Sequence, residues 1–409
     1  MKNIQKRNLY LLAFISLIFF TECQNPTTDS GQVTGVSTAV EVDKILDMAR
    51  QQFCLLAQDA SRADRIPRTL NKEGEMHWTN LGFDWTEGFF PGTSWYFYEI
   101  TQDEKWRGVA EKFQSQYEAH KTRTTNHDLG FIFNCSYGNG YRLTQNEAFK
   151  EVMITAGDSL ITRFNPNIGC IQSWDVDSGW QAERGWKFPV IVDNMMNLEL
   201  LFELTNLTGD PKYREVAVHH ANTTIKNHFR PDNSSYHVVD YDPETGAVRS
   251  KNTAQGYSDE SSWARGQAWG LYGYVVCYRY TENPIYLNQA KKIADFILQN
   301  DRIEADKIPY WDYDAPNVPN EPRDASAAAI TASALIELSD YADQKYIDYA
   351  KEILTSLSST EYFAEKGTNH HFILKHSVGS IPHGNEIDVP LNYADYYFIE
   401  SLVRLKKNN

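Results

Sequence analysis

The sequence predicts an all-α fold, an (α/α)6 barrel of six helical hairpins with short β-hairpins on one rim. Helices rich in aromatic and small residues recur along the chain and begin near residues 87, 129, 193, 265, 324 and 388. Between most of them lies a more charged amphipathic helix, such as residues 211–229 and 283–301, at a spacing of roughly 45 to 70 residues. Inner apolar helices that alternate with outer amphipathic ones can close into a barrel. The alternative is an open helical-repeat array.

The N-terminus reads as an export signal. Residues 1–8 carry three basic side chains, residues 9–20 are an apolar run of 12, and Cys23 precedes a polar stretch. This run is too short for an ordinary membrane span, so residues 1–22 are predicted to be a signal peptide. The position of Cys23 resembles that of a bacterial lipoprotein cysteine, although Phe20-Thr21-Glu22 departs from the usual small neutral residues. The alternative is cleavage by ordinary signal peptidase nearby.

The rest of the chain is predicted to hold a tether at 23–39 and a single catalytic barrel domain at 40–409. Residues 24–38 are rich in Ser, Thr, Gly and Gln, and helical periodicity begins near Glu41. We expect secretion through the inner membrane and a periplasmic, outer-membrane or cell-surface location. Contact with a membrane is expected only through the lipid anchor.

Composition excludes several classes of protein. The chain has 13% aromatic residues, which excludes disorder and rod-like repeats. A net charge of −15 disfavours binding to nucleic acid. The four cysteines after Cys23 lie far apart without metal-ligand spacing, so we expect buried thiols, no metal site and no cofactor.

Two aspartates stand at the starts of predicted inner helices. Asp128 follows His127 in the segment NHDLGF, and an aspartate there is commonly an N-cap. Asp193 lies between apolar segments in FPVIVDNMMNLELL. A carboxyl group in that setting is either a cap or a group whose pKa is raised by desolvation, as a general acid near neutral pH requires.

Aromatic and polar residues cluster in three further segments. In QGYSDESSWARGQAWGLYGY, Trp263 is either core or a ligand wall, while Arg265 offers a planar fork for a carboxylate. The loop SWDVDSGWQAERGW holds three tryptophans, which either pack on one another or stack on sugar faces. The segment SVGSIPHGNEIDVPLNYADYY is either a binding loop or a plain interhelical turn.

The segments NHDLGF, VDNMMNLELL and SSWARGQAWGLYGY resemble the signatures of unsaturated glucuronyl hydrolases, glycoside hydrolase family 88, and the similarity spans roughly residues 40–405 in the family's order. The resemblance implies removal of a terminal 4,5-unsaturated glucuronic acid from lyase products by hydration of a vinyl ether. It implies that Asp193 is the acid/base. It implies that Asp128 is a second essential aspartate, which holds ring hydroxyls and keeps Asp193 protonated.

The resemblance also implies a set of substrate contacts. It places His127, His237, Gln255, Trp263 and Arg265 around the sugar, with Arg265 as the partner of its carboxylate. In the loop 380–385, relatives that favour sulfated chondroitin tend to carry a second serine and a lysine. Here Ser380 is kept, but His383 and Asn385 stand in those two places, which argues against a preference for 6-sulfated units.

The expected substrate is therefore an acidic unsaturated oligosaccharide from a glycosaminoglycan or from ulvan. One alternative is an unsaturated rhamnogalacturonyl hydrolase that acts on pectin fragments. The other is a non-catalytic surface lipoprotein that captures acidic oligosaccharides, which would have no use for a partly buried acid.

Overall fold

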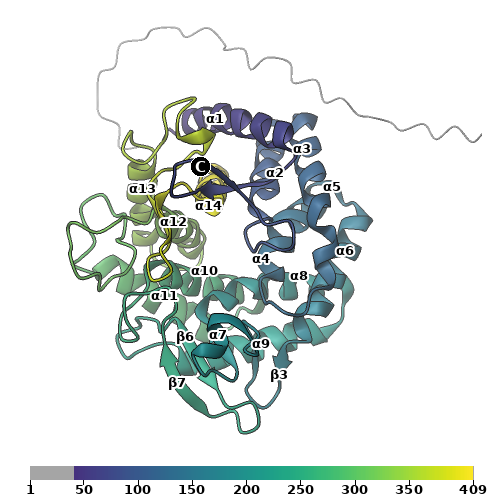
Figure 1. Ribbon diagram of the computed structural model, residues 1–409, viewed down its shortest axis with the longest axis vertical. Helices are drawn as coiled ribbons and strands as arrows, with labels where there is room; N and C mark the ends of the chain where they lie inside the picture. The colour runs from purple at the N-terminus through teal and green to yellow at the C-terminus, as the bar shows by residue number, and fades with distance from the viewer. Residues whose placement is uncertain (1–40, 409) are drawn as a thin grey trace, which may run out of the picture. The chain divides into compact units, whose positions relative to one another are not determined.

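The computed structural model describes residues 41–408 (Figure 1). The predicted signal peptide 1–22, the tether 23–39 and the lipidated Cys23 lie outside the described residues. Within residues 41–408, no helix combines the length and apolar character needed to span a membrane.

The described residues form two concentric sets of helices, six inner and six outer. The inner set is α2 (Phe89–Thr101), α4 (Leu129–Phe133) with η2 (Asn134–Gly138) and α5 (Asn139–Thr144), η3 (Val192–Asn197) with α8 (Leu198–Thr208), α10 (Ala264–Thr281), α12 (Ala325–Ser339) and α14 (Asn392–Asn408). The outer set is α1 (Val42–Ala63), α3 (Glu104–Gln114), α6 (Glu147–Ile161), α9 (Pro211–Asn227), α11 (Pro284–Gln299) and α13 (Lys345–Leu357). The inner helices begin within a few residues of the predicted starts.

The ring of helices is closed. Helix α14 packs against α12 on one side and against α2 on the other, so the last inner helix meets the first (Figure 1). This closure confirms the (α/α)6 barrel and excludes the open array.

Burial explains the two layers. Residues 264–277 of α10 and 325–338 of α12 are buried on every face, as expected for helices rich in Ala, Gly and aromatic residues. The outer helices bury one face only. Several outer helices begin at an Asp or Asn whose side chain accepts a hydrogen bond from the backbone N–H two residues on, namely Asp103, Asn146, Asp210 and Asn283.

Short antiparallel sheets lead into the inner helices. The strands are β1 (Pro67–Leu70), β2 (Met76–Trp78), β3 (Phe164–Asn165), β4 (Cys170–Ile171), β5 (Pro189–Ile191), β6 (Val238–Tyr241), β7 (Val248–Asn252), β8 (Ser377–Ser380) and β9 (Asn385–Val389). Strands β6 and β7 form one of the short hairpins that were expected, and β5 pairs with β6 to extend it to three strands. The short elements η1 (Ser115–Thr122), α7 (Gly179–Glu183) and η4 (Asn369–His371) connect the larger ones. Cys54, Cys135, Cys170 and Cys277 are buried, as predicted.

Candidate active site

Asp193 lies where a strand turns into an inner helix. It is the second residue of η3, directly after β5, and its side chain is 11% exposed. The N-cap residue of η3 is Ile191, and Asp193 lies inside the first turn, so the N-cap alternative is wrong. Its Oδ2 is buried, has no hydrogen-bond partner and lies 3.6 Å from His237 Nε2. Burial raises the pKa of Asp193 to about 7, against the opposing positive charge of Arg265.

The three-stranded sheet places His237 opposite Asp193. Ile191 pairs with Val238, and the backbone N–H of Val192 donates to the carbonyl of His237 at 3.0 Å. His237 Nδ1 accepts hydrogen bonds from the backbone N–H groups of Ala254 and Gln255 at 3.1 and 3.2 Å. The ring proton is therefore on Nε2, which faces Asp193. Burial lowers the pKa of His237 well below its usual value, so this histidine is neutral.

Asp128 and His127 form a similar pair. Asp128 precedes α4 but makes no capping hydrogen bond with its side chain. His127 Nε2 lies 3.2 Å from Asp128 Oδ1. Asn197 Oδ1 accepts from the backbone N–H of Phe131, so its Nδ2 is the donor to His127 Nδ1 at 3.2 Å. The proton of His127 is therefore also on Nε2, and burial lowers the pKa of His127 to about 3.

The two carboxyl groups are electrostatically coupled. Burial raises the pKa of Asp128 to about 8, and the charge of Asp193 adds to that rise. Because ionisation of either group hinders ionisation of the other, the pair holds a proton near neutral pH. A buried carboxyl that keeps its proton at pH 7 can act as a general acid. The site therefore has a proton donor without any titrating histidine.

The guanidinium group of Arg265 is not free to bind a carboxylate in the way that the sequence predicted. Its side chain is 1% exposed, and its Nη1 lies 3.1 Å from Asp324 Oδ2. Nη1 also donates to the carbonyl of Val378, and Nη2 donates to that of Gly379 at 2.6 Å. The guanidinium group of Arg265 thus anchors β8 to the start of α10. The Nε atom of Arg265 is buried without a hydrogen-bond partner. A direct contact between Arg265 and the substrate stays a prediction.

Trp263 and Gln255 contact other residues of the site and help to position them. Trp263 is 2% exposed, and its ring lies 4.5 Å from the ring of His237 and 4.4 Å from the guanidinium of Arg265. It fixes His237 rather than offering an open wall. Gln255 Nε2 donates to the carbonyl of Gly379 at 3.2 Å, which ties the histidine segment to β8.

The three loop tryptophans form one aromatic cluster beside the site. Trp174 lies 5.1 Å from Trp180 and stacks on Trp186 at 5.9 Å. Trp174 also meets His237 edge-on at 6.3 Å, and Trp180 meets His383 at 5.2 Å. Trp186 is buried, while Trp174 and Trp180 keep partly exposed faces. Both alternatives therefore hold in part, since the tryptophans pack on one another and still leave aromatic surface.

The loop 380–385 is the tip of the β8–β9 hairpin. Ser380 pairs with Asn385 across the two strands, and the hydroxyl group of Ser380 is 2.7 Å from His383 Nδ1. Ser380 is buried, whereas His383 and Asn385 are exposed. The hairpin therefore presents His383 and Asn385 to solvent next to the aromatic cluster.

Sequence reasoning missed two residues that organise the site. Asn197 orients His127, and Asp324 pairs with Arg265. Asp324 also caps α12, its side chain accepting from the backbone N–H groups of Ser326 and Ala327. The one signal for Asp324 was its position before a predicted helix, which shows a cap but not an ion pair. Among residues 41–408, no group of three or more His, Cys, Asp or Glu side chains has the geometry of a metal site.

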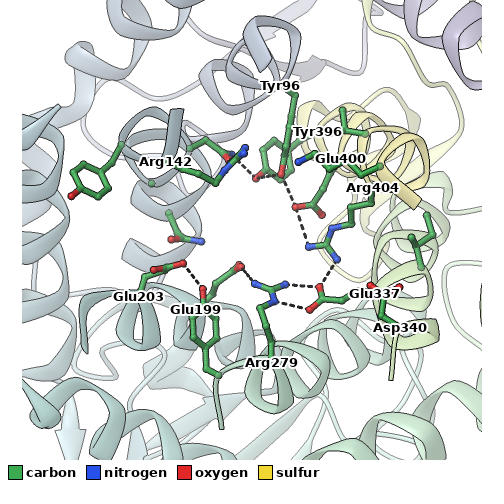
Figure 2. A pocket seen from close by; sticks show the side chains of 18 of the residues that line it. Tyr96, Arg142, Glu199, Glu203, Arg279, Glu337, Asp340, Tyr396, Glu400 and Arg404 are labelled. Carbon is green, nitrogen blue, oxygen red and sulfur yellow. Dashed lines mark hydrogen bonds and ion pairs between the residues drawn. The ribbon is translucent and has the colours of Figure 1, made fainter. Parts of the chain in front are cut away.

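A cavity of about 600 Å³ lies toward the C-terminal ends of the inner helices, opposite the ends that carry the candidate active site (Figure 2). The three arginines that line it are already paired with glutamates. Arg279 bonds Glu337 and Glu199, Arg404 bonds Glu337, and Arg142 bonds Glu99. Since all the predicted catalytic residues stand at the N-terminal ends, this cavity is separate from the candidate active site.

Comparisons with known proteins identify the family and support the fold. The model of the family described as Glycosyl Hydrolase Family 88 matches residues 61–397. A relative from Formosa agariphila, an unsaturated glucuronyl hydrolase, is 40% identical over 402 residues and covers 98% of both chains. A solved structure of an unsaturated glucuronyl hydrolase specific for heparin is 44% identical with a TM-score of 0.85, and covers 90% of this chain and 97% of that one.

A second solved structure is that of the unsaturated glucuronyl hydrolase of Bacillus sp. GL1, responsible for the degradation of glycosaminoglycan. It is 32% identical with a TM-score of 0.82, and covers 90% of this chain and 97% of that one. Fold and comparisons together define the class, a glycoside hydrolase built on an (α/α)6 barrel. The chain belongs to glycoside hydrolase family 88.

Proposed function

We propose that this enzyme removes the terminal 4,5-unsaturated glucuronic acid from oligosaccharides that polysaccharide lyases produce. The observation that carries the proposal is the buried carboxyl pair, each member faced by the Nε2–H of a neutral histidine. The names of the Formosa and Bacillus relatives support the same substrate.

Asp193 is the proposed acid/base. In its protonated form it delivers a proton to carbon 4 of the unsaturated ring. As a carboxylate it then accepts a proton from the water that adds at carbon 5, which restores the starting state. The hemiketal formed at carbon 5 opens and expels the aglycone. The Nε2–H of His237 faces Asp193 Oδ2 from 3.6 Å, which is beyond hydrogen-bond distance in this structure.

Asp128 is proposed to bind ring hydroxyl groups and to share the proton of the pair. Its orientation is set by His127, which Asn197 fixes in turn. Neither aspartate acts as a covalent nucleophile in this scheme. The separation of carboxyl groups that distinguishes retaining from inverting glycosidases therefore does not apply.

Glycosaminoglycan fragments are the favoured substrate because two similar solved structures are described by heparin specificity and by glycosaminoglycan degradation. Ulvan fragments are the second candidate. The test is to follow the ultraviolet absorbance of the conjugated enol acid with unsaturated disaccharides from chondroitin, heparin, ulvan and pectin lyases. Loss of absorbance with a glycosaminoglycan product supports the proposal. Loss with the pectin product alone would indicate the rhamnogalacturonyl alternative, and binding without any loss would indicate a binding protein.

We also propose export and anchoring through lipidated Cys23, supported by the basic, apolar and Cys-containing order of residues 1–23. In the host cell, the full-length protein should sediment with membranes and the Cys23→Ser variant should not. Equal release of both would exclude the anchor.

A further inference from the structure

The tip of the β8–β9 hairpin is connected to the histidine that faces Asp193 by a series of aromatic rings. Aromatic contacts connect the two places, since His237 meets Trp174, Trp174 meets Trp180, and Trp180 meets His383. If the unsaturated sugar sits at Asp193, the sugar that follows it extends along this cluster toward the tip. The tip is residues 380–385, as above.

Two cations from separate segments flank the tip. Lys72 belongs to the turn between β1 and β2, and its Nζ is 3.8 Å from the position that a Cβ atom on Gly384 would occupy. Arg184 directly follows α7, and its guanidinium lies 5.6 Å from the ring of Trp186. Burial and then the charge of Arg184 lower the pKa of His383, which places Arg184 electrostatically close to the tip.

The carboxylates of the hairpin do not cancel these charges. Glu386 is paired with Arg68 at 2.7 Å, and Asp388 with His376 at 2.6 Å. Across residues 41–408, no ion pair involves Lys72 or Arg184. Among residues 41–408, the guanidinium of Arg184 makes one hydrogen bond, a long one of 3.4 Å to the carbonyl of Thr253. Both cations are exposed, so they are free to meet a ligand.

We propose that Lys72 and Arg184 are specificity-determining residues that bind an anionic group, such as a sulfate ester, on the sugar next to the unsaturated uronate. The inference rests on the proposed function. Asn385 leaves the hairpin itself without a cation, but the cations come from two other loops. The sequence argument against sulfated units considered the hairpin alone, and the fold restores positive charge at the same place.

The test compares kcat/KM for matched unsaturated disaccharides that differ only in one sulfate on the aglycone. The wild-type enzyme should prefer the sulfated member. Lys72→Ala and Arg184→Ala should each lower kcat/KM on it by about threefold, and the double variant by about tenfold, as expected for exposed ion pairs. On the unsulfated member the change should stay below about twofold. The preference should shrink as salt is added.

An unsulfated tetrasaccharide, whose aglycone carries only a carboxylate, separates the two sources of negative charge. A loss on it in the double variant shows that carboxylates bind there, and a loss confined to the sulfated disaccharide shows a sulfate site. Lys226→Ala, on the outer helix α9, is the matched control and should change nothing.

Equal losses on the sulfated and unsulfated disaccharides, or no loss on any substrate with an anionic aglycone, would overturn the inference while leaving the proposed function intact. If the wild-type enzyme turned over none of these substrates, the proposed function would fail first, and this inference with it.

Discussion

At the scale of residues, the histidines are fixed donors. His127 and His237 both accept hydrogen bonds at Nδ1 and direct Nε2 at an aspartate. Because burial keeps both rings neutral, neither supplies the proton for catalysis. The proton that can be transferred resides on the carboxyl pair, and the surrounding apolar residues keep it there at pH 7.

The pH dependence follows from this pair. The pKa values of Asp193 and Asp128 are raised to about 7 and about 8, so the pair loses its proton as the pH rises through that range. Since the first step needs a protonated acid, kcat/KM should be retained below about pH 7 and fall about tenfold per unit above about pH 8. A pH profile on the best disaccharide measures this. A rate that stays constant from pH 6 to pH 9.5 would contradict it.

At the scale of elements, the starts of the inner helices could be predicted because each is an apolar helix whose first residues include Gly or Asp. Asp128 and Asp193 were found in this way. The role of Arg265 could not be predicted in this way, because its partners Asp324 and Val378 stand 59 and 113 residues further along the chain. Only the folded ring brings these segments together. The tautomers of His127 and His237 depend likewise on neighbours from other elements.

Helix α4 packs closely against η3, which carries a residue that positions the site. A Cβ atom on Gly130 would lie 2.3 Å from the Cα of Asn197, which orients His127. Gly130→Ala should therefore lower the free energy of unfolding by about 1 to 3 kcal/mol and lower kcat/KM as well. Urea unfolding and steady-state kinetics measure both effects. Gly82→Ala, where nothing lies within 4 Å of the new Cβ, is the matched control. An unchanged Gly130→Ala variant would show that this contact does not position His127.

At the scale of the whole molecule, ion pairs hold the ends of the barrel opposite the active site together. Glu337 of α12 accepts from Arg279 of α10 and Arg404 of α14, which links three inner helices (Figure 2). These arginines stand near helix C-termini, where positive charge is favourable. Despite burial, the two arginines hold the pKa of Glu337 at about 2.

Glu337→Gln should destabilise the fold without changing the chemistry. It leaves two partly buried arginines incompletely paired, and we expect the free energy of unfolding to fall by about 2 to 4 kcal/mol at pH 7. Because the pKa is depressed in the folded state, this contribution is present above about pH 4.5 and is lost as the pH falls toward 2. Urea unfolding at pH 7 and at pH 3 measures it. Glu215→Gln on α9 is the control, and an equal effect of both variants would contradict a role for the network.

The central claim is that Asp193 is the acid/base of a hydration reaction, and Asp193→Asn tests it most directly. Loss of enol absorbance is measured together with calorimetric binding of the same disaccharide. The account predicts that the variant folds, binds the substrate with nearly unchanged affinity and loses turnover by at least about a thousandfold. Asp175→Asn, an exposed carboxylate on the tryptophan loop, should remain active. An Asp193→Asn variant that hydrates the disaccharide at the wild-type rate would contradict the mechanism.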